Sequence, residues 1–574
     1  MNQLIKNVQV YNTFTQSFEK KNVYIQEDKF YYICDDEPLE SQKVIDGQGK
    51  YMIPGLIDIH MHIESSMTVP GEFSKAVLPH GVTTVVADPH EIANVFGIRG
   101  IETMISNDTT LDIFYGIPSS VPSTNEHLET TGGKIDVDDV KQLLENPRIL
   151  CLGEVMNFKD LIGGQNTLIN QIIQACHEKR WQLPIEGHCP KITGLDLARY
   201  IYQGVDADHT QQTPESIVEK IKNGMFLEIQ RKSMNADTIR TLVEHQFYEY
   251  FALVTDDVMA DQLEQGHLNL LIKLAYDLGM PIEKAIYCAT YTPARRMHMI
   301  DRGCIAPGKI ADFILLDDLY SFSIDSVYKK GQCVYHQTKQ IEIQEQQSQF
   351  PQEFYHSLYA RQAKNEDFMI PSSKKEVLCH VMEVQPHSTF TKHLQMKLPV
   401  KDGYVDYQSA GLCLLTIFER YQKNGHDCAS VFDAFFCGRE RISIQGAVAT
   451  SWAHDHHNIM ILGNNIEDMV IAQHQLLQQQ GGYLVVQKQK IQANTVLNIG
   501  GIVSDQPLKE LAQDLRQVRK AMEDLGYVHD NVIMSLSTLS LPVSPELKVT
   551  DYGMLDTYHQ TIVPLMEDSY ENID

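Results

Sequence analysis

The sequence contains no stretch of 18 uninterrupted apolar residues, and its N-terminus, MNQLIKNVQVYN, lacks a continuous apolar segment. A membrane-spanning helix needs about 20 mostly apolar residues and a secretory signal needs an apolar core, so we expect no membrane anchor. Basic residues are also scarce, because 48 Lys and Arg stand against 75 Asp and Glu, for a net charge of −27. This charge repels phosphodiesters and anionic lipids, which argues against nucleic acid and membranes as partners.

Closely spaced cysteines are missing as well. The 11 cysteines are scattered and no Cys-x-x-Cys pair occurs, a pattern typical of reduced thiols in the cytoplasm rather than of disulfides or a thiolate zinc site. No Gly-rich phosphate loop follows the first long apolar run of the central region, since IESSMTVPGEF comes after His62. A nucleotide-binding fold therefore has no support.

The chain has 574 residues, of which 43% are hydrophobic and 21% charged, a mixture typical of globular domains. Short β-type runs fill residues 1–50 and return at 304–340, which predicts one small β-sandwich domain with a second domain inserted in it. Residues 51–303 alternate apolar runs with segments of helical period, which predicts a (β/α)8 barrel, with an open doubly wound sheet as the alternative. The eight runs are GLIDIHMH (55–62), TTVVADPH (83–90), LDIFYGIPSS (111–120), RILCLGEVMNF (148–158), LPIEGHCP (183–190), VDADHT (205–210), MFLEIQ (225–230) and FALVTDD (251–257).

A polar, Gln-rich segment at 337–353 predicts a linker or an exposed helix. Beyond it, strands such as LCHVMEV and GGYLVVQ mix with helices such as EDMVIAQHQLLQQQ. We therefore expect a C-terminal α+β domain over 365–574.

Imidazoles and carboxylates stand at the ends of the predicted barrel strands. His60 and His62 share one face of the first strand, because residues i and i+2 of a strand point the same way. Barrels place their active sites at this end of the strands, and burying such groups unpaired costs several kcal/mol apiece. The predicted metal ligands are His60, His62, Glu154, His188, His209 and Asp256.

Two divalent cations bridged by a carboxylate would stabilise this set, and imidazole with carboxylate suits manganese, iron or zinc. Such ions lower the pKa of bound water from 15.7 to about 7, which makes hydroxide available at neutral pH and predicts a hydrolase. Asp256 could accept the proton and return it to the leaving group. Each residue also has a structural interpretation, such as a helix cap for His188, His209 or Asp256 and a core ion pair for Glu154.

The motifs PGLIDIHMHIESS, HGVTTVVADPHEIANVFGIRG, LGEVMNF, GHCPKITGLDLARYIYQGVDADH and LVTDDVMADQLEQGHLNLLIKLAYDLG resemble the amidohydrolase superfamily and, within it, the bacterial adenine deaminases. The resemblance extends through GAVATSWAHDHHNIMILGNNIEDM to nearly the whole chain. It implies hydrolysis of adenine to hypoxanthine and ammonia in purine salvage, by a cytoplasmic homo-oligomer that prefers manganese or iron.

The same resemblance implies that Glu154 bridges the two ions. It also implies that Asp88, His90 and Glu91 face the purine and exchange protons with its ring nitrogens, with Glu91 the strongest candidate for a catalytic role beside Asp256 and Glu154. Their alternative interpretation is a helix N-cap with a solvated acidic turn.

The chain departs from the family pattern at three places. Thr210 stands where the family has Glu, the seventh strand ends Gln-Arg-Lys-Ser (230–233) instead of Arg-Glu-Gly-Ser, and His456 replaces Ser within His454–Asp455–His456–His457. This tetrapeptide is interpreted as a buried network, with a lid or an additional metal site as alternatives. The departures leave open another aminated heterocycle or a cyclic amide as substrate, and a non-catalytic scaffold is the third hypothesis.

Overall fold

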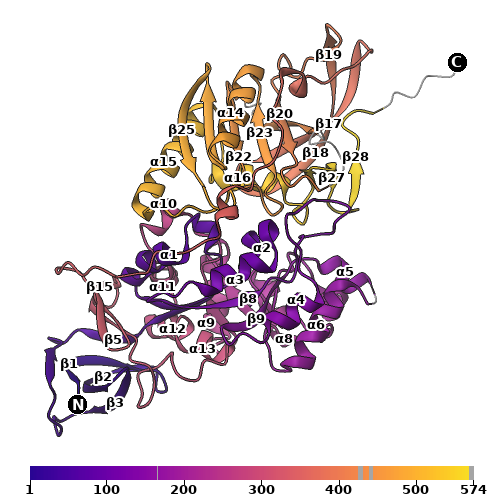
Figure 1. Cartoon of the computed structure of the whole chain (residues 1–574). Coiled ribbons are helices and arrows are strands. Elements are labelled where there is room, and N and C mark those ends of the chain that lie inside the picture. The colour runs from indigo at the N-terminus through magenta and orange to yellow at the C-terminus, as the bar shows by residue number, and fades with distance from the viewer. Residues whose placement is uncertain (165, 424–430, 439–443, 568–574) are drawn as a thin grey trace. The chain divides into compact units, whose positions relative to one another are not determined.

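The computed structural model describes residues 1–164, 166–423, 431–438 and 444–567 (Figure 1). They form two compact units. The first unit contains residues 1–89, 104–119 and 136–348, and the second contains residues 90–103, 120–135 and 349–574. Among the described residues, no helix is both long and apolar enough to cross a membrane.

Each of the eight predicted runs contains a strand of a parallel barrel in the first unit. Strands β6 to β10 form one parallel sheet and β11 to β13 a second. The Asp206 amide donates to the Ile185 carbonyl at 3.1 Å, and the Asp256 amide donates to the His60 carbonyl at 3.1 Å, so the two sheets join at both edges. The predicted barrel is therefore confirmed, with strands β6 (Leu56–Met61), β7 (Val82–Ala87), β8 (Asp112–Ile117), β9 (Ile149–Val155), β10 (Ile185–Gly187), β11 (Ala207–Asp208), β12 (Phe226–Ile229) and β13 (Phe251–Leu253).

Helices follow the barrel strands, and several of them begin with a side chain that caps the first turn. In α8 (Pro214–Lys222), for example, the Thr213 hydroxyl accepts from the Ser216 amide and Pro214 occupies the first turn, where no amide is needed. The barrel strands are mostly apolar because one face packs inside the barrel and the other against helices, and their polar residues are the exceptions that concern the site. The remaining larger helices of this unit are α1 (Pro70–Val77), α4 (Val137–Leu143), α5 (Phe158–Gly163), α6 (Leu168–Lys179), α7 (Gly194–Tyr202), α9 (Ala236–Glu244), α11 (Leu268–Asp277), α12 (Ile282–Cys288) and α13 (Tyr291–Arg296).

The segments before and after the barrel meet in one sheet of eight strands, where the sequence predicts a small β-sandwich. Strand β5 pairs with β14 across the insertion, so the barrel is inserted in this sheet, as predicted. Along the sheet the order is β16, β15, β14, β5, β1, β2 and β3, with β4 beside β1. These strands are β1 (Gln3–Asn12), β2 (Ser17–Gln26), β3 (Lys29–Cys34), β4 (Lys43–Asp46), β5 (Tyr51–Pro54), β14 (Phe313–Asp318), β15 (Ser323–Lys329) and β16 (Gln332–His336).

The predicted linker contains no α-helix over residues 337–353. It lies against the barrel of the first unit, since the Ser74 hydroxyl donates to Glu345 at 2.6 Å and the Gly71 amide donates to the Ser348 hydroxyl at 3.2 Å. The linker interpretation is therefore the correct one of the two alternatives.

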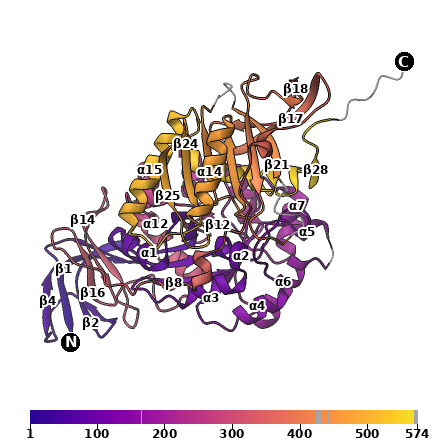
Figure 2. The same ribbon diagram turned by 45° about the horizontal axis from the view of Figure 1, so that its top comes forward.

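The second unit is built on a mixed nine-stranded sheet, with helices α14 (Ile466–Gln478) and α15 (Leu508–Asp524) beside its strands (Figure 2). A separate three-stranded sheet follows, and both agree with the predicted α+β domain. The strands are β17 (Glu376–Gln385), β18 (Ser388–Lys401), β19 (Tyr404–Val405), β20 (Cys413–Phe418), β21 (Val431–Gly438), β22 (Ala447–Thr450), β23 (Ile459–Gly463), β24 (Gly482–Gln487) and β25 (Lys490–Val496), then β26 (Leu547–Thr550), β27 (Gly553–Asp556) and β28 (Thr561–Val563).

Two segments from within the predicted barrel range belong to this second unit. Helix α2 (His90–Phe96) and the first part of α3 (Ile98–Ser106) are one, and residues 120–135 are the other. Thr130 shows why, because its amide donates to Asp551 at 2.9 Å and its carbonyl accepts from Asn458 Nδ2 at 3.1 Å. The boundaries predicted at 51, 303 and 365 divide the chain into continuous segments and stay predictions. The two compact units are instead assembled from several separate segments each.

Candidate metal centre

The six predicted ligands gather in the first unit, at the carboxyl ends of the barrel strands. His60 lies on β6 and Glu154 on β9. His62, His188 and His209 directly follow β6, β10 and β11, and Asp256 lies three residues after the end of β13. Five of the six are buried, and the His188 side chain keeps 28% of its surface exposed. The structure therefore brings together the whole set, namely His60, His62, Glu154, His188, His209 and Asp256.

Glu154 lies between two groups of imidazoles. Its Oε2 is 2.7 Å from His188 Nδ1 and 3.3 Å from His209 Nε2. Its Oε1 faces the other way and lies 3.6 Å from His62 Nε2. Glu154 therefore directs one carboxylate oxygen to His188 and His209 and the other to His62.

The ring orientations of two histidines are fixed by backbone carbonyls. His62 Nδ1 lies 2.9 Å from the Asp88 carbonyl, and His209 Nδ1 lies 3.1 Å from the Gly187 carbonyl. Each carbonyl can only accept, so Nδ1 carries the proton and Nε2 presents its lone pair to the centre. His60 Nε2 is buried and has no hydrogen-bond partner among the described residues, which fits a metal ligand.

Asp256 connects the metal centre to the closure of the barrel. Its amide donates to the His60 carbonyl at 3.1 Å, and its φ of 59° places it in the left-handed region, which non-glycine residues adopt at some cost. This backbone conformation brings Oδ1 to 3.4 Å from His62 Nε2, while Oδ2 lies 3.5 Å from Lys232 Nζ.

Electrostatics keep both carboxylates of the centre ionised. Burial alone raises the pKa of Glu154, but His209 and His188 outweigh it and hold that pKa well below its usual range. Burial likewise raises the pKa of Asp256, but Lys232 and His62 outweigh burial and hold that pKa well below its usual range. Two buried carboxylates facing four imidazoles therefore form an anionic, nitrogen- and oxygen-rich site, which suits a divalent transition metal.

Three supporting carboxylates were not predicted to support the centre. Asp88 Oδ2 accepts from the Glu154 amide at 2.9 Å, so Asp88 positions the residue between the two groups of imidazoles. Asp58 accepts from the Thr255 hydroxyl at 2.6 Å and connects the ends of β6 and β13. Glu228 Oε2 lies 3.4 Å behind His60 Nδ1. The available signal was a carboxylate inside an otherwise apolar strand, as in GLIDIHMH for Asp58 and MFLEIQ for Glu228.

The positions that depart from the family pattern have specific partners. The Thr210 hydroxyl donates to Asp208 at 2.9 Å, and Gln230 Nε2 donates to the His209 carbonyl at 3.0 Å. Lys232 is the exception, because its ammonium approaches Asp256 at the centre itself.

The three residues predicted to face the purine are divided between the two units. Asp88 lies in the first unit, and His90 and Glu91 begin α2 in the second. There, Glu91 Oε1 lies 2.7 Å from His454 Nδ1, and Glu91 Oε2 contacts His457 Nε2.

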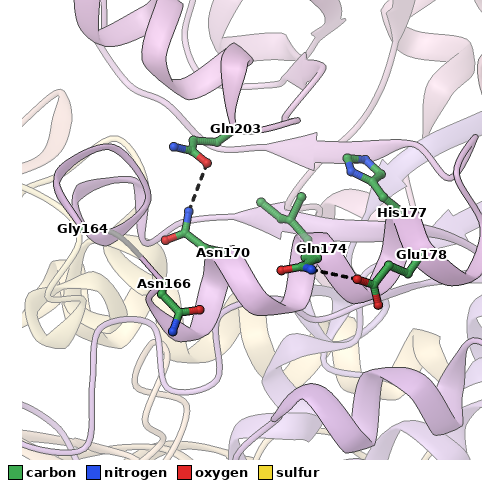
Figure 3. A pocket seen from close by; sticks show the side chains of 8 residues that line it. Gly164, Asn166, Asn170, Gln174, His177, Glu178 and Gln203 are labelled. Carbon is green, nitrogen blue, oxygen red and sulfur yellow. Dashed lines mark hydrogen bonds between the residues drawn. The ribbon is translucent and has the colours of Figure 1, made fainter.

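A hollow of about 590 Å³ lies elsewhere in the first unit, along α6 (Figure 3). Asn170 Nδ2 donates to Gln203 Oε1 at 3.2 Å across it, and Gln174 Nε2 donates to Glu178 at 2.7 Å. None of the six ligands lines it, and its walls are mainly amides with one imidazole and one carboxylate. It is therefore distinct from the metal centre.

Two family models match most of the chain. The model of the amidohydrolase family matches residues 51–334, and that of the adenine deaminase C-terminal domain matches residues 388–561. An adenine deaminase of Clostridium perfringens is 52% identical over 98% of this chain and 99% of its own length. The chain belongs to the adenine deaminase family. Adenine deaminase 2 of Oenococcus oeni is 50% identical over 98% of each chain, and the adenine deaminase of Lactobacillus delbrueckii subsp. bulgaricus is 47% identical over 98% of this chain.

Membership of the adenine deaminase family identifies the chain as a hydrolase of carbon–nitrogen bonds. The family and the clustered imidazoles and carboxylates together indicate a divalent-metal site.

Proposed function

We propose that this chain hydrolyses adenine to hypoxanthine and ammonia with two divalent metal ions, manganese or iron by preference and zinc as the third candidate. The observation that carries the proposal is the position of Glu154, whose two oxygens face different imidazoles at 2.7 Å and 3.6 Å. The full-length relatives named adenine deaminase supply the substrate. His60, His62 and Asp256 would hold one ion and His188 and His209 the other, with Glu154 between them.

When bound, the ions lower the pKa of coordinated water to about 7 and so supply the nucleophile at neutral pH. Asp256, ionised and beside His62, would serve as the base that takes up a proton as water adds to the ring and as the acid that gives it to the departing ammonia. Asp88 acts indirectly, since its carboxylate holds the Glu154 amide and its carbonyl fixes the His62 ring. The contacts predicted for Asp88, His90 and Glu91 with the purine stay predictions.

The decisive experiment is an ammonia assay with adenine, using protein loaded with manganese or iron under reducing conditions. We expect hypoxanthine and ammonia in equal amounts, loss of both after chelation, and recovery when the ion returns. Protein that retains its ions and releases no ammonia from adenine would refute the assignment of substrate.

A second substrate class is supported by Lys232, which the family pattern does not contain and whose ammonium lies 3.5 Å from Asp256. A lysine paired with Asp256 alters the polar groups beside the centre, which supports another aminated heterocycle or a cyclic amide as the alternative substrate. A panel of aminopurines and cyclic amides, compared by kcat/KM between the natural chain and Lys232→Gly, separates the two. The predicted homo-oligomer and the cytoplasmic location stay predictions.

A further inference from the structure

A second cluster of metal-ligating side chains lies entirely within the second unit. Glu91, at the start of α2, meets the segment between β22 and β23, which is 366 residues away in the sequence. All members are buried, with at most 5% of their surface exposed. They are His90, Glu91, His454, Asp455 and His457.

Three contacts in this cluster are too short for chance neighbours yet lack hydrogen-bond geometry, whereas Glu91 Oε2 and His457 Nε2 form a hydrogen bond. Glu91 Oε1 lies 2.7 Å from His454 Nδ1 and 3.5 Å from His90 Nε2, yet it has no hydrogen-bond partner among the described residues. Asp455 Oδ1 lies 3.3 Å from His454 Nδ1, and Asp455 Oδ2 also lacks a partner in this part of the chain. Nitrogen and oxygen atoms this close, but not aligned for a hydrogen bond, are arranged as ligands of an ion would be, and one ligand atom each of His90, Glu91 and Asp455 lie within 4.8 Å of one another.

The barrel centre provides an internal standard. Its contacts are 2.7 Å for His188 with Glu154, 3.3 Å for His209 with Glu154 and 3.4 Å for His62 with Asp256. The second cluster has similar contacts, at 2.7 Å, 3.3 Å and 3.5 Å, which lie on either side of the spacing of roughly 3.0–3.4 Å expected of ligands around one ion.

Charge also requires a cation here. Two carboxylates, Glu91 and Asp455, are buried together, and a buried unpaired charge costs several kcal/mol. The nearby guanidinium of Arg420 does not neutralise them, because it donates to the His457 carbonyl, the Gly500 carbonyl and the Ser357 hydroxyl. An ion or a proton must therefore supply the positive charge.

We propose that Glu91, Asp455 and the imidazoles of His90, His454 and His457 hold a further divalent transition-metal ion. Imidazole with carboxylate and without thiolate suits manganese, iron or zinc. The ion would fasten α2 to the segment between β22 and β23. These two parts of the second unit lie far apart in the sequence. This role differs from the proton exchange predicted for Glu91 and does not depend on the proposed deamination.

Metal counting tests the proposal. Wild-type chain is dialysed against manganese or zinc, passed through a desalting column and analysed by mass spectrometry of the elements, with circular dichroism to verify folding. We expect three ions per chain in the wild type and two in each of Glu91→Gln, His454→Gln and Asp455→Asn. The control is His456→Ser, because His456 is equally buried but its Nδ1 accepts from the Asn458 amide at 3.0 Å, and it should keep three ions.

The barrel serves as the reverse control. A chain with both His188→Asn and His209→Asn should lose barrel ions and keep the ion at Glu91, so failure of the proposed active site and failure of this proposal are distinguishable. Equal ion counts in wild type, Glu91→Gln and Asp455→Asn would overturn the proposal and leave a proton on His454 as the neutralising charge.

Anomalous diffraction at the manganese edge decides the question even if the variants fail to fold. Crystals of the manganese-loaded wild type should show a peak within about 2.5 Å of Glu91 and His454. Peaks in the barrel without one at this cluster would refute the additional ion.

Discussion

Replacing Gly153 with alanine should disturb the metal centre without touching any ligand. A Cβ atom at this position would lie 2.3 Å from Asp88 Oδ2 and 2.6 Å from Asp88 Cγ. Since carbon and oxygen atoms in contact stay roughly 3.3 Å apart, the carboxylate must move by about 1 Å. Asp88 would then lose its 2.9 Å hydrogen bond from the Glu154 amide.

The expected size follows from that bond. A buried hydrogen bond to a charged group contributes about 1.5–3 kcal/mol, and each 1.4 kcal/mol is about a factor of ten, so metal affinity should fall roughly 10- to 100-fold. Gly163→Ala is the matched control, because its Cβ would meet nothing within 4 Å and Gly163 lies only a few residues beyond Glu154, at the end of α5.

The assay is competition for manganese between the protein and a coloured chelator, run in parallel with ammonia release from adenine. We expect Gly153→Ala to lose both ion retention and turnover, and Gly163→Ala to lose neither. Wild-type affinity in Gly153→Ala would show that Asp88 does not position Glu154, and this reasoning would be wrong.

Three further predictions concern charge. Glu154→Gln removes the charge that faces both groups of imidazoles, so ion content and turnover should fall together while the circular dichroism spectrum stays unchanged; a fully metallated, active variant would contradict the bridging role. Asp112 accepts from Arg302 and Lys329 at 2.7 Å, and although burial opposes them these cations lower its pKa from 3.8 to about 2. This group therefore stabilises the fold above pH 4, and Asp112→Asn should cost about 2 kcal/mol in urea unfolding at pH 7, with the difference from wild type shrinking as the pH falls towards 2; a constant difference would refute the cause. Burial lowers the pKa of Lys548 from 10.5 to about 7, so charging it costs stability below pH 10. Lys548→Met should raise the melting temperature at pH 7 and have a smaller effect at pH 9.5, and a lower melting temperature at pH 7 would argue that the lysine is needed.

The barrel could be predicted because its evidence is local. Each parallel strand is a short apolar run, and the polar residue that ends it marks the open end of the barrel. His60 and His62 were placed on one face by the two-residue period of a strand, and the structure agrees.

The support around the centre could not be predicted, because it depends on contacts between distant segments. Nothing in the sequence next to Asp88 indicates that its side chain accepts from the amide of Glu154, 66 residues later. Glu91 is the clearest case, since it lies at the start of a helix in the sequence, whereas its side chain contacts His454 and His457, the latter 366 residues away. The family pattern predicted its importance but not its partners.

Residue 256 is the last of the six proposed ligands to be synthesised, and its amide is one of the groups that join the eighth strand to the first. A chain interrupted before this point has neither the joined edge nor the sixth ligand. In a cell extract, only molecules translated beyond β13 should therefore retain the barrel ions tightly. The ion content of the barrel would then report how many chains have been synthesised past this strand.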